Sequence, residues 1–404
     1  MDRVEFEDTI FRALLRAQGL RLPPISQGLG PSPPSEDSES QQEIRELAKR
    51  LIDTAYENGL DPPRDYKIKS KKLSGGAVTE YVWRVSSTLP FAFKASRNPD
   101  LARQATTLRD LRNSEILPAS CRELFPRVYS SSIDVSPFAY IMEFFGDAYT
   151  NLRDYLFAGK SPRKYHKVIE RVVNVLFDLF RTTVQPNLIP NLTKIYIDRI
   201  RERMDGAKGA NPKFKALVES PIVICSEDYA PYVWYLEQVQ ERLPKLSPPY
   251  CTFVHGDPHP GNIFFKLGAG GPTVKLIDPK AWIWGDYIFD VGKFVHYLLV
   301  TGPVEDGRGV QVRVRGGSPT RVDYKIVPPP PALQAVKVAG KHLTKFAKSI
   351  GDPHYRIRLN LSLASNLLGL CENRLKRHKP LNQNAVIYYC EGLRYLRLVA
   401  EGLT

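Results

Sequence analysis

The chain has 404 residues, 43% apolar and 25% charged, with a formal net charge of +14. These values are typical of a globular protein with two or three structural units. No apolar run approaches the roughly 18 residues of a membrane span, and the N-terminal residues lack the apolar core of a signal peptide. The five cysteines are scattered and form no C-x-x-C pair, which argues against a zinc site or a disulfide framework. We therefore expect a cytoplasmic protein.

The positive charge attracts anions such as nucleotides, phosphorylated metabolites, nucleic acids or acidic membrane surfaces. Basic residues form only short clusters, at 67–72 and 374–379. Such clusters are weak support for a nucleic-acid partner, and we expect none. A solvated basic surface is an equally good interpretation of the net charge, and the sequence does not indicate an oligomeric state.

The N-terminal part of the chain divides into three segments. Residues 1–20 have the apolar spacing of a short amphipathic helix, and residues 21–40 are rich in Pro, Ser and Gly, which indicates a flexible linker. Ser40 and Glu43 then stand at capping-box spacing, and apolar residues recur at helical intervals from 44 to 55. We expect the folded domain to begin at this helix.

Strand-like patterns dominate the next hundred residues. The segments 81–85, 91–94 and 138–143 are rich in aromatic and β-branched residues and predict strands. Between them, residues 101–112 have the apolar spacing of a helix. The pattern predicts a small lobe in which one helix is inserted into a sheet, an α+β arrangement.

After about residue 150 the predicted elements are mainly helical. Apolar spacing predicts helices at 168–180, 233–243, 332–350, 355–377 and 383–400. Short strand-like segments interrupt them at 263–265 and 274–277, and residues 302–331 have the pattern of a hairpin insertion. We therefore divide the chain into an N-terminal segment with its linker (1–40), an N-lobe (41–147) and a C-lobe (148–404).

Two polar segments lie close together in the sequence, VHGDPHPGNI at 254–263 and KLIDPK at 275–280. Asp257 precedes Asn262 by five residues, the spacing of the base and the metal-holding Asn in the protein-kinase catalytic loop. Asp278 follows a predicted strand. A carboxylate can orient a hydroxyl and accept its proton, and Mg²⁺ prefers carboxylate and amide oxygens. The pattern predicts phosphoryl transfer, with Asp257 as the base and Asn262 and Asp278 as the magnesium ligands.

The motif HGDxHxxN at 255–262 resembles the signature of the aminoglycoside phosphotransferase and choline kinase superfamily, small-molecule kinases with a protein-kinase-like fold. The segment 285–293 is similar to the next element of that family, in which an Asp braces the catalytic loop, and Asp290 is the matching residue. The resemblance implies a small N-terminal antiparallel sheet lobe, a larger mainly helical C-terminal lobe, and the use of ATP and Mg²⁺. We interpret His255 and His259 as supports of the loop.

The same resemblance implies a nucleotide-binding site in the N-lobe. Its residues are Ser74, Gly75, Gly76, Lys94, Glu143 and Phe145. The first three form a turn whose backbone covers the phosphates, and Lys94 steadies the α- and β-phosphates. The last two belong to a hinge whose backbone binds adenine. A preference for ATP over GTP does not follow from these residues.

The sequence departs from the family pattern at two places. Gln104 stands where the resemblance predicts the Glu that pairs with Lys94, and Glu115 can replace that Glu only if the helix extends to it. Asp278 is followed by Pro-Lys instead of Phe-Gly. The second departure raises the alternative that Lys280 approaches the phosphates or an anionic substrate.

The predicted reaction is ATP-dependent transfer of the γ-phosphate to a hydroxyl of a sugar, metabolite or antibiotic. Basic residues dominate 190–215, 308–325 and 374–379 of the predicted helical lobe, which favours a neutral or anionic acceptor over a polycationic one. Two alternatives remain open. The absence of an A-P-E segment after Asp278 counts against a protein kinase, and Gln104 favours a nucleotide-binding pseudokinase.

Overall fold

The computed structural model describes residues 38–57, 67–69, 81–86, 91–158, 165–280, 283–307, 310–376 and 381–402. Contacts divide the chain into two compact units. The first unit includes the described residues between 38 and 152 and between 255 and 283, and the second includes those between 153 and 254 and between 284 and 402. The predicted helix at 1–20 and the turn of Ser74, Gly75 and Gly76 lie outside the described residues.

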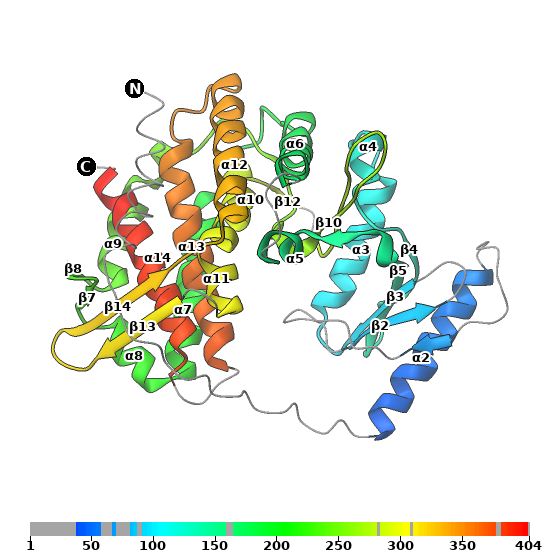
Figure 1. The fold of residues 1–404 in the computed structure, drawn as a ribbon, viewed down its shortest axis with the longest axis horizontal. Helices are drawn as coiled ribbons and strands as arrows, with labels where there is room; N and C mark the ends of the chain where they lie inside the picture. Colours follow the sequence, from blue (N-terminus) through cyan, green and yellow to red (C-terminus); the bar gives the residue numbers. More distant parts are fainter. Residues whose placement is uncertain are drawn as a thin grey trace. The chain divides into compact units, whose positions relative to one another are not determined.

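An antiparallel sheet forms the base of the first unit, with the strand order β1-β2-β3-β5-β4 (Figure 1). Its strands are β1 (Lys67–Lys69), β2 (Tyr81–Ser86), β3 (Phe91–Ser96), β4 (Val128–Ser132) and β5 (Phe138–Glu143). Helices α3 (Asp100–Asn113) and α4 (Ala119–Arg122) lie between β3 and β4 in the chain. The strands β2, β3 and β5 and helix α3 confirm sequence predictions. The serine-rich strand β4 was missed because serine is more typical of turns than of strands.

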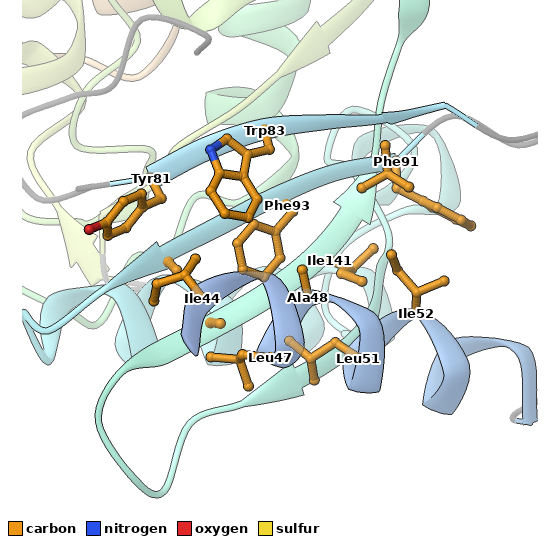
Figure 2. Packing of buried hydrophobic residues seen from close by; sticks show 13 residues of the cluster. Ile44, Leu47, Ala48, Leu51, Ile52, Tyr81, Trp83, Phe91, Phe93 and Ile141 are labelled. Carbon is orange, nitrogen blue, oxygen red and sulfur yellow. The ribbon is translucent and has the colours of Figure 1, made fainter. Parts of the chain in front are cut away.

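Helix α2 (Ser38–Glu57) contributes an apolar stripe to the core of the first unit. Its buried residues recur every three or four positions, as one face of a helix requires, and Figure 2 shows them beside the aromatic side chains of the sheet. On β2 and β3, alternate residues share one face, and the rings of Trp83 and Phe93 stack with centroids 5.4 Å apart. Burial of each large apolar side chain contributes about 1.5–3 kcal/mol to the stability of the fold. Because several such side chains of α2 are buried, the helix is part of the core. The helix predicted from 44 to 55 is confirmed and is longer at both ends.

A smaller antiparallel sheet of the first unit carries the two polar segments. It consists of β6 (Thr150–Asn151), β10 (Ile263–Lys266) and β11 (Thr273–Leu276), in the order β11-β10-β6. Ile263 pairs with Leu276 in register, so the loop before β10 and the loop after β11 lie at the same end of this hairpin. The Ile277 N–H donates to the Asn262 carbonyl at 3.0 Å and holds the two loops together.

The second unit is mainly helical (Figure 1). Its helices are α5 (Leu152–Phe157, beginning at the last residue of the first unit), α6 (Tyr165–Thr182), α7 (Arg199–Ala210), α8 (Pro212–Val218), α9 (Tyr232–Arg242), α10 (Tyr287–His296), α11 (Gly302–Asp306), α12 (Pro330–Ser349), α13 (Tyr355–Lys376) and α14 (Gln383–Gly402). Helix α13 packs against α7, α10 and α14. Gly292 of α10 allows a close approach to α13, because a Cβ there would lie 2.1 Å from the Ser362 Oγ.

The segment with the pattern of a hairpin contains β13 (Val310–Arg315) and β14 (Thr320–Ile326), which pair antiparallel. Strand β14 also pairs in parallel with β7 (Ile222–Ile224), and β7 pairs with β8 (Glu227–Tyr229). The Tyr324 hydroxyl donates to the Glu391 carboxylate of α14, and Arg394 donates to the same carboxylate at 3.0 Å. A buried polar contact therefore attaches the hairpin to the helical part of its unit.

The predicted arrangement of elements is confirmed: an N-terminal antiparallel sheet is followed by a mainly helical C-terminal part. The lobe boundaries near residues 40 and 147 stay predictions. Within the described parts of the chain, no helix combines the length and the apolar character that crossing a membrane requires.

Candidate functional site

The loop from His255 to Asn262 is closed by hydrogen bonds to its own backbone. The Asp257 carbonyl accepts the His259 N–H at 2.8 Å and the Asn262 Nδ2 at 3.0 Å. The Asn262 N–H donates to the His259 carbonyl at 2.8 Å, and the His259 Nδ1 accepts the Gly261 N–H at 3.0 Å. The five-residue spacing therefore returns the Asn262 side chain to the backbone of Asp257, and His259 holds the turn between them.

His255 is fully buried beneath this loop. Its Nδ1 accepts the Asp257 N–H at 3.2 Å, and its ring stacks on Phe125. Burial lowers the pKa of His255 to about 4, although the nearby carboxylates of Asp257 and Asp278 oppose that change. The ring is therefore neutral at pH 7, and its Nδ1 is available as an acceptor for the loop backbone.

Asp278 lies two residues after β11 and has a φ of +57°, in the left-handed region that non-glycine residues rarely adopt. Its Oδ1 contacts the Nζ of Lys94, which β3 places there. Burial alone lowers the pKa of Lys94, but the charge of Asp278 and, to a smaller extent, Tyr140 raise it above its usual value. Lys94 is therefore a buried cation that is already paired with the predicted metal ligand.

The partner of Lys94 differs from both candidates in the sequence. Glu115 is exposed and lies beyond the end of α3 at Asn113. Gln104 is buried on α3, and its Oε1 has no hydrogen-bond partner among the described residues. The acid that Lys94 contacts is Asp278, 184 residues away in the chain. No local pattern in the sequence signals so distant a pair.

Lys280 adds a second cation to the same end of the small sheet. Its N–H donates to the His255 carbonyl at 2.9 Å, and its Nζ lies 3.4 Å from the Asp257 Oδ2. The stem of Lys280 passes over Gly256, where a Cβ would lie 2.7 Å from the Lys280 Cβ. Gly256 also has a φ of +81°, so glycine is required there for both its conformation and its space.

Asn262 and Asp278 present oxygen atoms that suit a magnesium ion. Because the Asn262 Nδ2 donates to the Asp257 carbonyl, the Oδ1 is the side-chain atom left for a cation. Asp278 has a second carboxylate oxygen besides the one that Lys94 contacts. Hard Mg²⁺ prefers such oxygens and usually completes its shell with phosphate oxygens and water. The residues present therefore fit the predicted ion.

The predicted hinge lies beside an aromatic cluster that the sequence did not reveal. The Glu143 N–H donates to the Arg127 carbonyl at 2.8 Å. The Phe145 ring lies 6.1 Å from that of Phe264 and 5.2 Å from that of Tyr149, measured between centroids. Phe264 alternates with the buried Phe265 on β10, so it points to the opposite face. In the sequence, only this alternation could have indicated that Phe264 lies on the face opposite to Phe265.

The Asp that the sequence assigns to bracing, Asp290, is buried on α10 in the second unit, and its role stays a prediction. A different acid of the same segment, Asp286, caps α10 and contacts two further side chains. Its Oδ1 accepts the Ile288 N–H at 3.2 Å and caps α10, and its Oδ2 accepts the Tyr196 hydroxyl at 2.9 Å. Asp286 also pairs with Arg358 on α13, at 2.8 Å from Nε to Oδ2.

Arg358 is fully buried between two carboxylates. Its guanidinium donates to Asp286, to Asp352 and to the Leu246 carbonyl, so all five of its N–H groups have an acceptor. Sequence reasoning missed this cluster, because Arg358 lies within a helical pattern and Asp286 is 72 residues away. We refer to Arg358, Asp286 and Asp352 as the Arg358 cluster.

Comparisons with known proteins add to this geometry. The methylthioribose kinase of Bacillus velezensis is 35% identical over 83 residues, 20% of this chain and 20% of that protein. The methylthioribose kinase of Exiguobacterium sibiricum is 32% identical over 71 residues, 17% of each chain. The chain thus matches about a fifth of the length of these curated relatives.

Two solved structures resemble the chain at low identity. Choline kinase from Cryptosporidium parvum Iowa II gives a TM-score of 0.46 at 11% identity and covers 90% of this chain and 97% of its own. The complex of APH(2")-IIia with GDP and kanamycin gives 0.45 at 12% identity and covers 88% of this chain and 99% of its own.

A family match covers strands β2 to β5 of the first unit, the catalytic-loop segment and part of the second unit. The model of the phosphotransferase enzyme family, APH, matches residues 75–323, which is more than half of the chain. Members of this family are small-molecule kinases that use a nucleoside triphosphate. The chain therefore belongs to the phosphotransferase enzyme family.

Proposed function

We propose that the chain transfers the γ-phosphoryl group of ATP to a hydroxyl of a small molecule, with Asp257 as the base. One observation carries the proposal. The hydrogen bond from Asn262 to the Asp257 carbonyl and the bond from Ile277 to Asn262 bring the proposed base and both proposed metal ligands to one end of a single hairpin. Phosphoryl transfer depends mainly on such positioning and on charge neutralisation.

Asp257 performs the proton chemistry in this proposal. Its backbone is fixed by His255, His259 and Asn262, while a fifth of its side chain is exposed and accessible to an acceptor hydroxyl. The carboxylate orients the hydroxyl and accepts its proton as the new O–P bond forms and the bond from the γ-phosphorus to the bridging oxygen of the leaving ADP breaks. His255 and His259 maintain the loop, and we assign Asp290 a similar supporting role.

Lys94, Asn262 and Asp278 prepare the donor side. Lys94 is charged and buried, which suits contact with the α- and β-phosphates. Asn262 and Asp278 would hold Mg²⁺, which neutralises charge on the phosphates when it is bound. The present contact of Lys94 with Asp278 keeps both side chains oriented toward one place.

The nucleobase end of the donor site lies at the hinge in this proposal. The backbone of Glu143 and Phe145 would bind adenine, and the rings of Phe145, Tyr149 and Phe264 provide an apolar surface beside it. We keep Ser74, Gly75 and Gly76 as the phosphate-covering turn on sequence grounds.

Replacement of Asp257 by Asn tests the proposal, because the amide preserves size but cannot accept the proton. We expect kcat to fall by about 10²- to 10⁴-fold. Turnover is measured as ADP release over a panel of hydroxyl compounds that includes methylthioribose, choline and kanamycin. The affinity for Mg²⁺ and a non-hydrolysable ATP analogue, measured by calorimetry, should change less than about threefold.

The matched control is Asp134→Asn, an exposed residue of the β4–β5 connection, which should leave turnover unchanged. Normal turnover in Asp257→Asn would rule out Asp257 as the base. Loss of nucleotide binding together with turnover would assign it a structural role instead.

A further inference from the structure

Lys280 is positioned by a backbone hydrogen bond and by the space above Gly256. Its backbone N–H is bound to the His255 carbonyl, and the preceding Pro279 restricts the backbone. Its stem occupies the space above Gly256, where a Cβ would lie 2.7 Å from the Lys280 Cβ and 2.8 Å from its Cγ. These contacts direct the ammonium to one side of Asp257.

The two lysines of the site are divided between the two aspartates. Lys94 contacts Asp278, the proposed metal ligand, and is buried. Lys280 lies 3.4 Å from Asp257, the proposed base, and 49% of its side chain is exposed. An ammonium has three donors, so one carboxylate oxygen at this distance leaves donors for a bound molecule.

Geometry ties Lys280 to the acceptor. A hydroxyl that donates its proton to the Asp257 Oδ2 lies about 3 Å from that oxygen. Because the Lys280 Nζ is 3.4 Å from the same oxygen, the hydroxyl lies within about 6.5 Å of the ammonium. Substituents next to the reacting hydroxyl therefore lie in the field of a positive charge that is only partly screened by solvent.

We propose that Lys280 determines the class of acceptor: the site takes an alcohol that carries a carboxylate or a phosphate close to the reacting hydroxyl. An amine at the same place is disfavoured, because it meets the ammonium of Lys280. This inference rests on the proposed function, since it assigns Lys280 to the acceptor side of that site.

Acceptors that share a carbon skeleton and differ in charge test the inference. One series is glycerol, glycerate, glycerol 3-phosphate and 3-aminopropane-1,2-diol, and a second is glucose, gluconate, glucose 6-phosphate and glucosamine. The readouts are kcat/KM for each compound and, independently of turnover, its Kd in the presence of Mg²⁺ and a non-hydrolysable ATP analogue. The carboxylate and phosphate members show which anion is preferred.

In the unchanged enzyme, we expect an anionic member of each series to have a higher kcat/KM and a lower Kd than the neutral member. Lys280→Gln should reduce that preference roughly 10- to 100-fold, the loss expected for one charge-assisted hydrogen bond. Lys280→Glu should favour the amine. Lys266→Gln removes the same charge from an exposed position at the end of β10 and should leave the preference unchanged.

Three results would overturn the inference. The first is equal binding and turnover of all charge classes. The second is a preference for anions that survives Lys280→Gln. The third is a uniform fall for every acceptor together with a raised KM for ATP, which would place Lys280 on the donor side. Each of these leaves the proposed function intact if Asp257→Asn still lowers kcat by about 10²-fold or more, whereas normal turnover in Asp257→Asn removes the base assignment itself.

Discussion

Two clusters in this chain each pair cationic side chains with carboxylates, one in a buried position and one in a partly exposed position. In the Arg358 cluster, one guanidinium lies between two carboxylates, its side chain is 0% exposed, and every donor has an acceptor. In the catalytic-loop cluster, Lys94 and Lys280 each contact one aspartate, and Asp278, Asp257 and Lys280 are all partly exposed. The Arg358 cluster belongs to the second unit, and the catalytic-loop cluster belongs to the first unit.

The difference separates a structural role from a catalytic one. A buried charge whose donors are all satisfied has no capacity left for a ligand, and removal of one partner leaves an uncompensated charge in the interior. A partly exposed pair can exchange partners with a substrate at a smaller cost, because water solvates whichever group is released. We therefore expect substitutions in the two clusters to change different measured quantities.

Arg358→Gln should have the larger effect on stability. It leaves Asp286 and Asp352 buried without their cation, so the free energy of unfolding should fall by about 3–5 kcal/mol. Urea denaturation followed by tryptophan fluorescence measures the change. Arg321→Gln, on the exposed face of β14, is the control and should change stability by less than about 0.5 kcal/mol.

A compensated variant tests the cause of that loss. Arg358→Met combined with Asp286→Asn and Asp352→Asn removes all three charges, and it should be more stable than Arg358→Gln. Equal instability of the two variants would show that packing, not unpaired charge, dominates the cluster.

Lys94→Met should have a small effect on stability and a large effect on activity, the opposite of what we expect for Arg358→Gln. The released Asp278 carboxylate is partly exposed, so the free energy of unfolding should change by less than about 2 kcal/mol. The kcat/KM for ATP should fall by roughly 10- to 100-fold through the loss of a charge-assisted contact to phosphate. A loss of stability as large as that of Arg358→Gln, with kcat/KM unchanged, would contradict the division into two kinds of cluster.

In the first unit, the titration of His255 should change the free energy of unfolding with pH, and this effect is smaller than that of Arg358→Gln. The folded-state pKa of His255 is lowered to about 4, below the unfolded value of about 6.5. The stabilisation by the neutral ring is therefore complete above pH 6.5 and is lost as the pH falls toward 4. At pH 5 the loss should be about 2 kcal/mol.

A comparison with His255→Asn isolates this contribution, because the amide oxygen can still accept the Asp257 N–H but does not titrate in this range. Urea denaturation at pH 7 and pH 5 should show a smaller decrease for the variant than for the unchanged chain. Equal decreases would mean that other groups account for the acid sensitivity.

The sequence predicted the parts of the site that depend on local spacing. The separation of Asp257 from Asn262 matches one turn, and the position of Asp278 follows from the β10–β11 hairpin. The main strands and long helices were also predictable, because their apolar periods are regular. The resemblance of HGDxHxxN to a known signature added the family.

Contacts between distant residues were not predictable from one sequence. Lys94 reaches Asp278 across 184 residues, and Arg358 reaches Asp286 across 72. The local pattern of neither cation indicates which acid it contacts. Likewise, the position of Lys280 above Gly256 depends on the positive φ of Gly256. The residue types at these two positions do not specify that backbone angle.

The attachment of the β13–β14 hairpin has a mechanical consequence. Strand β14 is held along one edge by β13 and along the other by β7, and Tyr324 fastens it to α14 through Glu391. Stiffness must therefore increase from the exposed turn at 316–319 toward the base. A swinging motion of the whole hairpin would have to separate the β7 ladder and break a buried contact, so any flap-like movement is confined to the turn.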